Sequence, residues 1–95
     1  MIQSFSCKNT ESFYTSGTVP RKASWQAVKK IAARKLDMLD AAIELEDLKL
    51  PPNNKLKALS GNFKGFHSIR INDQWRIVFK WENGHANEVK ICDYH

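Results

Sequence analysis

Two arginines and an acid-aromatic-histidine ending are the residues of this chain best suited to chemistry. Arg70 and Arg76 flank a short polar segment, and Asp93, Tyr94 and His95 end the sequence. A guanidinium group binds phosphate through two parallel hydrogen bonds, and an imidazole with an ordinary pKa of about 6.5 exchanges protons near neutral pH. These residue types fit a reaction at a phosphate group. The simpler interpretation of a terminal histidine is a frayed chain end.

Three strand-like stretches must position these groups, because each alternates apolar and polar residues between turn-forming segments. They are Phe66 to Ile71, Trp75 to Trp81 and Glu88 to Asp93. If residues 72–74 form a three-residue loop, Arg70 faces Arg76 on the solvent side of the sheet. Opposed like charges destabilise a sheet by roughly a few tenths of a kcal/mol. A phosphate bound between the two guanidinium groups would relieve this repulsion, and so would a neighbouring carboxylate such as Asp73.

The second hairpin needs an extra residue to keep its apolar side chains on one face. The Asn-Gly pair after the second strand is typical of a two-residue turn, which would pair Phe79 with Glu88. Lengthening the loop to residues 83–85 instead pairs Phe79 with Val89 and Lys80 with Glu88. We therefore predict a three-residue or bulged turn.

The same register brings the end of the chain to the first turn. It places Asp93 opposite Trp75, so that residues 94–95 fall beside the turn at 72–74 and close to Arg76. The predicted chemistry is therefore concentrated at one end of the sheet.

A long helix is predicted from about Ser24 to the residue before Pro51, because apolar residues recur there at spacings of three or four. These residues are Trp25, Val28, Ala32, Leu36, Leu39 and Ile43. The N-terminal half of this helix is basic, which fits either a rim that touches a nucleic acid or an ordinary solvated face. Ile2 to Cys7 is predicted to form a short edge strand, and residues 15–22 a mobile loop.

The overall composition predicts one small domain, residues 1–95, with a single core. Fifteen Lys and Arg against ten Asp and Glu give a net charge of +5, which favours polyanionic partners. Cys7 and Cys92 are too few for a disulfide scaffold and are expected to be reduced. The chain has no signal-like or membrane-spanning apolar run, so a cytoplasmic location is expected. It also lacks phosphate-loop, zinc and serine-hydrolase motifs, and we expect neither a metal nor a cofactor.

The residues of the predicted sheet also resemble a known family. LSGNFKGFHSIRINDQWRIVFKW (residues 59–81), the terminal DYH, MIQSF at the start and RKLDMLDAA on the helix together resemble HigB-type toxins of bacterial type II toxin-antitoxin systems. These toxins belong to the wider RelE group, and the sequence is similar to their GraT branch.

This resemblance implies an α+β fold of the RelE-like microbial ribonuclease type, with an N-terminal strand and helices packed on a small antiparallel sheet. It implies a ribosome-dependent endoribonuclease, an mRNA interferase, that cleaves mRNA in the ribosomal A site by 2′-OH attack and so inhibits translation. It also implies a HigA-type helix-turn-helix antitoxin that holds the toxin inactive, with contact to operator DNA only through that antitoxin. The alternative is a non-catalytic RNA- or ribosome-binding module of the same fold.

The resemblance also implies roles for individual residues. The expected catalytic residues are Arg76, His95, Tyr94, Asp93 and Lys57. The expected RNA-binding residues are Arg70, Lys55, Lys80 and Lys64. Arg76 and Arg70 would stabilise the charge on the phosphorane, and His95 would donate or accept the proton. Some relatives carry a lysine where this sequence has Ser60, and the identity of the general base stays open.

Overall fold

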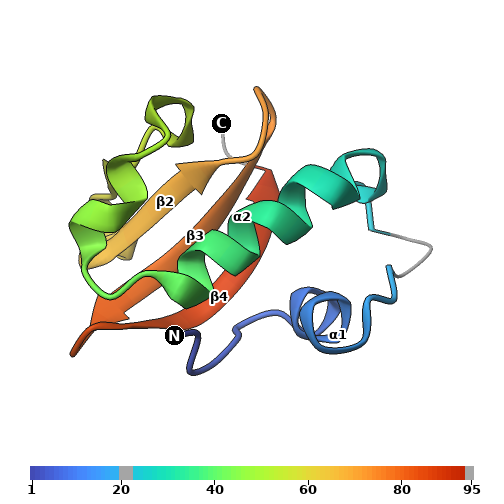
Figure 1. Cartoon of the computed structure of the whole chain (residues 1–95), viewed down its shortest axis with the longest axis horizontal. Helices are drawn as coiled ribbons and strands as arrows, with labels where there is room; N and C mark the ends of the chain where they lie inside the picture. Colours follow the sequence, from blue (N-terminus) through green and yellow to red (C-terminus); the bar gives the residue numbers. More distant parts are fainter. Residues whose placement is uncertain (20–22, 94–95) are drawn as a thin grey trace.

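A four-stranded antiparallel sheet with the strand order β1-β2-β3-β4 forms the centre of the protein. The computed structural model describes residues 1–19 and 23–93. The strands are β1 (Lys57–Ala58), β2 (Phe66–Arg70), β3 (Trp75–Glu82) and β4 (His85–Asp93), and the two α-helices are α1 (Lys8–Ser16) and α2 (Lys29–Ala41). In Figure 1, α2 lies across β3 and β4, and α1 lies beyond the β4 edge. The predicted α+β architecture is confirmed.

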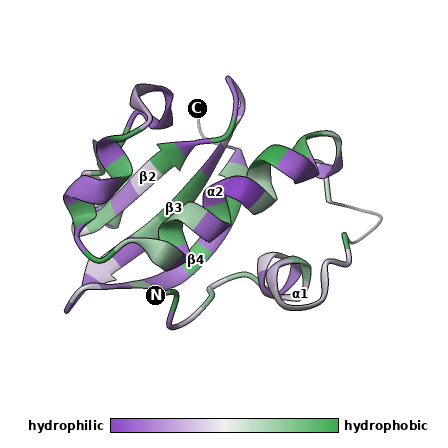
Figure 2. Ribbon diagram, viewed as in Figure 1, coloured by the Kyte–Doolittle hydropathy of each residue, from purple (hydrophilic) through white to green (hydrophobic). Residues whose placement is uncertain are grey.

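The core lies between α2 and one face of the sheet. Leu36 and Leu39 on α2 are fully buried and belong to one apolar cluster with Ile69, Ile77 and Phe79 on β2 and β3. Figure 2 shows the middle of β3 as hydrophobic and the turn between β2 and β3 as hydrophilic. Burial of these side chains is the main stabilising contribution, at roughly 1.5–3 kcal/mol for each large side chain.

The predicted helix over residues 24–50 is too long. It ends at Ala41, because the carboxylate of Asp47 accepts hydrogen bonds of 3.0 Å from the backbone N–H groups of Ile43 and Glu44. Asp47 and Glu44 form a capping box that begins a separate 3-10 helix. Ile43, predicted on the buried face, therefore points outward and is 79% exposed.

The first hairpin has the predicted register. Arg70 lies opposite Arg76, and Ile69 lies opposite Ile77. The backbone N–H of Ile71 donates to the carbonyl of Trp75 at 2.9 Å, which closes the three-residue loop. On the other side of β3, Trp75 faces Asp93 as predicted.

The second hairpin contains the predicted extra residue, but in the strand instead of the turn. Asn83 and Gly84 form a two-residue turn with φ of 52° and 79°, a combination suited to an Asn-Gly pair. The pairing shifts between Lys80–Asn87 and Val78–Lys90. The prediction of a longer turn and of a Lys80–Glu88 pair is therefore wrong.

A β-bulge at Glu88 takes up the extra residue. Its φ of 52° lies in the left-handed region, where a non-glycine residue is uncommon. The backbone N–H of Glu88 donates to the hydroxyl of Ser4 at 2.9 Å, and the hydroxyl of Ser6 donates to the Glu88 carbonyl at 3.0 Å. The bulge is therefore held by the N-terminal segment.

The N-terminal segment lies beside β4 but is not a regular strand. The predicted strand over residues 2–7 is reduced to two isolated parallel bridges, Ile2 to Ala86 and Phe5 to Val89. The predicted loop over residues 15–22 is also partly wrong, because α1 continues to Ser16. Residues 20–22 of that loop lie outside the described residues.

Candidate functional site

The face of the sheet turned away from α2 collects most of the predicted cations. Side chains alternate along each strand, so residues opposite one another share a face, and these residues lie on the side opposite Ile69 and Ile77. We call Lys57, Arg70, Arg76, Lys80 and Lys90 together the basic face. The pairs Lys57–Ser68 and Val78–Lys90 form one row across it, and Arg70–Arg76 begins the next row.

The guanidinium group of Arg76 is held in a fixed direction. Its Nε donates to the hydroxyl of Ser68 at 2.8 Å, and its Nη2 donates to the carbonyl of Lys55 at 2.7 Å. Ser68 is fully buried and lies opposite Lys57, so Lys57 is paired with the residue whose hydroxyl holds Arg76. A cation fixed in this way needs little further ordering when it binds a phosphate.

Arg70 is paired with a carboxylate on the neighbouring turn. Its Nη2 and the carboxylate of Asp73 form an ion pair, and the side chain of Asp73 is 99% exposed. Charge neutralisation, the simpler of the two interpretations of the Arg70–Arg76 pair, therefore holds for Arg70 in this structure. An exposed ion pair of this kind contributes roughly 0–1 kcal/mol, so a phosphate can displace Asp73 at small cost.

The loop that carries Lys55 is anchored by a buried amide. Asn54 is fully buried, and its Nδ2 donates to the carbonyls of Leu48 and Leu50 at 3.2 and 3.3 Å. Its Oδ1 accepts a hydrogen bond from the ammonium group of Lys35 on α2. This cluster connects α2 to the loop whose carbonyl orients Arg76.

Burial also changes the chemistry of Lys35. Removal of its ammonium group from water lowers the pKa of Lys35, and the positive charges of Arg34 and Arg70 lower it further. Lys35 is only 6% exposed, so it belongs to the interior and not to a solvated basic rim. Arg34 and the two lysines at the start of α2 are exposed.

Asp93 ends β4 at the same end of the sheet as Arg70 and Arg76. It lies opposite Trp75, so it belongs to the face of Ile77 and not to the basic face. Its Oδ2 accepts a hydrogen bond of 3.0 Å from the side-chain amide of Gln74. The predicted positions of Tyr94 and His95 lie outside the described residues. Their roles therefore stay predictions.

The remaining predicted cations differ in how close they lie to Arg76. Lys80 is on the basic face, one row further from Arg76 than the Lys57 row, and its Nζ lies 3.9 Å from a carboxylate oxygen of Glu82. Lys55 and Lys64 are both exposed on loops that border the sheet. The structure therefore brings Lys57, Arg70 and Lys80 onto one face with Arg76, and leaves Lys55 and Lys64 around its margin.

Sequence reasoning missed three residues of this face. Lys90 could have been found, because it lies between the inward-facing Val89 and Ile91 in an alternating stretch. The role of Ser68 depends on the side-chain direction of Arg76, which no sequence pattern encodes. Phe63 comes from the 3-10 turn Gly61–Phe63, which was predicted only as a loop, and the Nζ atom of Lys90 lies 5.1 Å from the centre of its ring.

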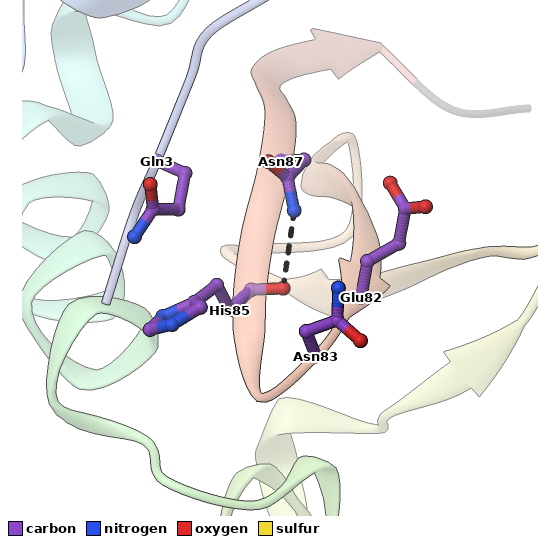
Figure 3. Close-up of a pocket in the computed structure, with 5 residues that line it drawn as sticks. All are labelled: Gln3, Glu82, Asn83, His85 and Asn87. Atoms are coloured by element: carbon purple, nitrogen blue, oxygen red, sulfur yellow. Dashed lines mark hydrogen bonds between the residues drawn. The ribbon is translucent and has the colours of Figure 1, made fainter.

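A hollow of about 220 Å³ lies at the other end of β3 from Arg76, beside the β3–β4 turn (Figure 3). It is lined by Gln3, Glu82, Asn83, His85 and Asn87. Inside it, the Nδ2 of Asn87 donates to the backbone carbonyl of His85 at 3.4 Å. The hollow shares no residue with the basic face, and it holds none of the predicted site residues.

Two absences hold for residues 1–19 and 23–93. No group of three or more His, Cys, Asp or Glu side chains there is arranged to hold a metal ion. No helix in the same ranges has the length and apolar character needed to cross a membrane.

The fold is shared with solved toxin structures. The chain superposes on a point mutant of YafQ from Escherichia coli with a TM-score of 0.61 and 11% identity, covering 98% of this chain and 93% of YafQ. It superposes on the YoeB–YefM complex from Staphylococcus aureus with a TM-score of 0.56 and 20% identity, covering 100% and 98% of the two chains. At 11% and 20% identity, these superpositions establish only that the chain has the same fold as these proteins.

The sequence relationship is more specific. Residues 3–95 match the family described as the RelE-like toxin of the type II toxin-antitoxin system HigB. The chain is 40% identical over 86 residues to Toxin HigB-1 of Vibrio cholerae, with 90% of each chain covered, and 35% identical over 95 residues to Endoribonuclease HigB of Proteus vulgaris, with 100% of each covered. The protein therefore belongs to the HigB family of RelE-like toxins of type II toxin-antitoxin systems. None of these likenesses bears on the GraT branch, which stays a prediction.

Proposed function

We propose that this toxin is a ribosome-dependent endoribonuclease that cleaves mRNA in the ribosomal A site and so inhibits translation. The observation that carries the proposal is the fixed guanidinium of Arg76, which lies opposite Arg70 at the edge of the sheet where β4 delivers Asp93. The Proteus vulgaris relative, which is aligned over the full chain, is named an endoribonuclease. Both the charge and the family support RNA as the substrate.

The proposed reaction needs no group from outside the substrate and the protein. The ribose 2′-oxygen attacks the adjacent phosphorus, a base takes the hydroxyl proton, the bond from phosphorus to the 5′-oxygen breaks, and an acid protonates that oxygen. Arg76 and Arg70 stabilise the negative charge of the phosphorane, and Lys57, opposite Ser68, supplies a further cation. We assign proton transfer to His95.

The other end-of-chain residues have supporting roles in this proposal. Asp93 orients a neighbouring group or acts as a weak base, and Tyr94 contacts a base or phosphate of the RNA. The cations at the margin, Lys55 and Lys64, hold the flanking RNA backbone together with Lys80.

We further propose the partners and place of action. A HigA-type helix-turn-helix antitoxin neutralises the toxin, and operator DNA is contacted only through that antitoxin. Residues 1–95 act as one domain on mRNA and the ribosome in the cytoplasm. The structures of YoeB bound to YefM support an antitoxin partner for a chain of this fold.

A purified translation system tests the activity. The wild-type protein should create new mRNA 5′ ends at a codon in the A site. Arg76→Ala should lower the cleavage rate by at least about 100-fold, the effect typical of removing a group that stabilises transition-state charge. Lys49→Ala removes the same charge from an exposed position outside the sheet and should cleave at the wild-type rate.

The same assay separates the alternative function. Ribosomes that stall on uncut mRNA with the wild-type protein would identify a non-catalytic ribosome-binding module. If Arg76→Ala cleaves mRNA at the wild-type rate, the protein is an endoribonuclease but the proposed catalytic site is wrong.

A further inference from the structure

An aromatic side chain lies over the basic face. The turn Gly61–Phe63 places the ring of Phe63 5.8 Å from that of Phe66, in an edge-to-face arrangement of 88°. The Nζ of Lys90 lies 5.1 Å from the centre of the Phe63 ring. Phe66 is on β2 and Lys90 is on β4, so the ring of Phe63 has contacts with side chains from the strands on both sides of β3.

The burial of the residue beneath it agrees with this position. Val78 is on the basic face, opposite Lys90, where α2 does not reach. It is nevertheless only 2% exposed, whereas Phe63 itself is 41% exposed. The basic face is therefore covered at Val78, and a large part of Phe63 faces solvent.

The distance from Phe63 to the candidate phosphate site suits a nucleotide. Val78 and Arg76 are two residues apart on one face of β3, a step of roughly 7 Å along the strand. A base above Val78 can therefore remain attached to a sugar whose phosphate reaches Arg76. Lys64 follows Phe63 directly in the chain, and with Lys90 it brings positive charge to the same place.

We propose that Phe63 is the stacking platform for one base of single-stranded RNA next to the phosphate held at Arg76. Every base has an aromatic face, so Phe63 contributes affinity and position without selecting a sequence. Phe66 supports the ring from its edge, and Lys90 supplies a neighbouring cation. This inference rests on the proposed function for its substrate class. It adds an RNA contact that lies outside the predicted set of site residues.

Fluorescence of 2-aminopurine tests the stacking directly. The base is placed at successive positions of a short RNA and of an mRNA on programmed ribosomes, with a 2′-deoxy sugar at the cleavage site to prevent cutting. Stacking quenches this fluorescence, so wild-type protein should quench strongly at one position. Phe63→Tyr should retain that quenching and Phe63→Leu should lose it. Ile43→Ala removes an exposed apolar side chain beside the β3–β4 turn, outside the basic face, and should behave as wild type.

An abasic scan gives a second measurement that does not depend on any variant. Removing the base at the quenched position should weaken wild-type binding by about 5- to 100-fold, the effect typical of one base stacked on an aromatic side chain. The same removal should leave binding by Phe63→Leu almost unchanged, because that variant has no stack to lose. Thermal unfolding confirms that each variant is folded.

The possible outcomes separate this inference from the proposed activity. Absence of position-specific quenching in both RNA samples, or equal quenching by wild type and Phe63→Leu, overturns the stacking platform. Quenching by a wild-type protein that cuts no mRNA on ribosomes supports the platform and removes the endoribonuclease. Cleavage of mRNA without position-specific quenching supports the endoribonuclease and overturns the stacking platform.

Discussion

At the scale of single residues, two acceptors that carry no net charge hold the guanidinium group of Arg76 within the part of the chain that the structure describes. The hydroxyl of Ser68 and the carbonyl of Lys55 lie 2.8 and 2.7 Å from its guanidinium nitrogens. A flexible cation would have to be ordered during the reaction, whereas this one is ordered by the fold. Ser68 is therefore a positioning residue for the proposed reaction.

The substitution Ser68→Ala should leave the fold intact and slow cleavage. We expect the rate of cleavage to fall by about 10-fold, since one hydrogen bond to a charged group is lost, while ribosome binding changes little. Single-turnover cleavage on programmed ribosomes separates the two quantities. Ser24→Ala, at an exposed position, is the matched control. A loss of ribosome binding with an unchanged cleavage rate would argue against a positioning role.

His67 gives a pH-dependent prediction at the same scale. Its ring stacks on Phe79 at 6.2 Å, its Nδ1 is buried without a hydrogen-bond partner in the described structure, and burial lowers the pKa of His67 below 6.5. The unfolded chain therefore binds this proton more tightly than the folded protein. The free energy of unfolding should decrease as pH falls from 6.5 through the lowered pKa.

Urea denaturation at several pH values measures this effect. Below pH 6.5, the free energy of unfolding should decrease less in His67→Gln than in the wild type, because glutamine does not titrate. Parallel stability curves for the two proteins would mean that His67 is not linked to folding.

At the scale of elements, a buried polar cluster connects α2 to the loop before β1. Asn54 takes part in hydrogen bonds with two backbone carbonyls and with the ammonium group of Lys35. The next residue, Lys55, has φ of 46° and presents its carbonyl to Arg76. The shape of this loop is therefore set from the interior.

Replacing Asn54 by Ala should destabilise the protein by about 2–4 kcal/mol, because two carbonyls lose a donor and a buried ammonium group loses its acceptor. Equilibrium urea unfolding measures the change. Asn53→Ala, one residue earlier and exposed, should lie within about 0.5 kcal/mol of the wild type. Adding Lys35→Met to Asn54→Ala should recover part of the loss, and no recovery would contradict the role given to Lys35.

The elements also show which parts of the fold were open to prediction. Alternation along β2 and β3 was enough to pair Arg70 with Arg76, because only one register buries the isoleucines. The end of α2 was missed because it depends on a side-chain cap from Asp47, in a stretch that keeps helical spacing. The place of the bulge was missed because it depends on serines more than eighty residues away in sequence.

At the scale of the whole molecule, Asp40 connects three parts of the chain. Its Oδ1 accepts a hydrogen bond of 2.9 Å from the backbone N–H of Ile2, and its carboxylate also interacts with Tyr14 on α1. Burial raises the pKa of Tyr14 to about 12, with a further contribution from Asp40. The N-terminal segment and α1 are thus both connected to α2.

Asp40→Ala should lower the free energy of unfolding by about 1–3 kcal/mol, because it removes the acceptor shared by these groups. It should also lower the pKa of Tyr14, which a pH titration of tyrosine absorbance detects. The chain has two tyrosines, so Tyr94 contributes a second transition to the same titration. Asp37→Ala, at an exposed position one turn earlier on α2, is the control for stability. Unchanged stability and an unchanged tyrosine titration would show that Asp40 does not connect these elements.

The bulge at Glu88 has a consequence for chain length in this hairpin. If that one residue is removed, the ladder becomes continuous, with Lys80–Asn87 followed by Phe79–Val89 and Val78–Lys90. No side chain changes face, so the sheet itself tolerates the deletion. The contacts of Glu88 with the two N-terminal serines are lost, and the parallel bridges on either side of it, Ile2–Ala86 and Phe5–Val89, no longer have the same spacing on the two segments. Homologous chains can therefore differ by one residue here and still present the same cations, provided that their N-terminal segments differ to match.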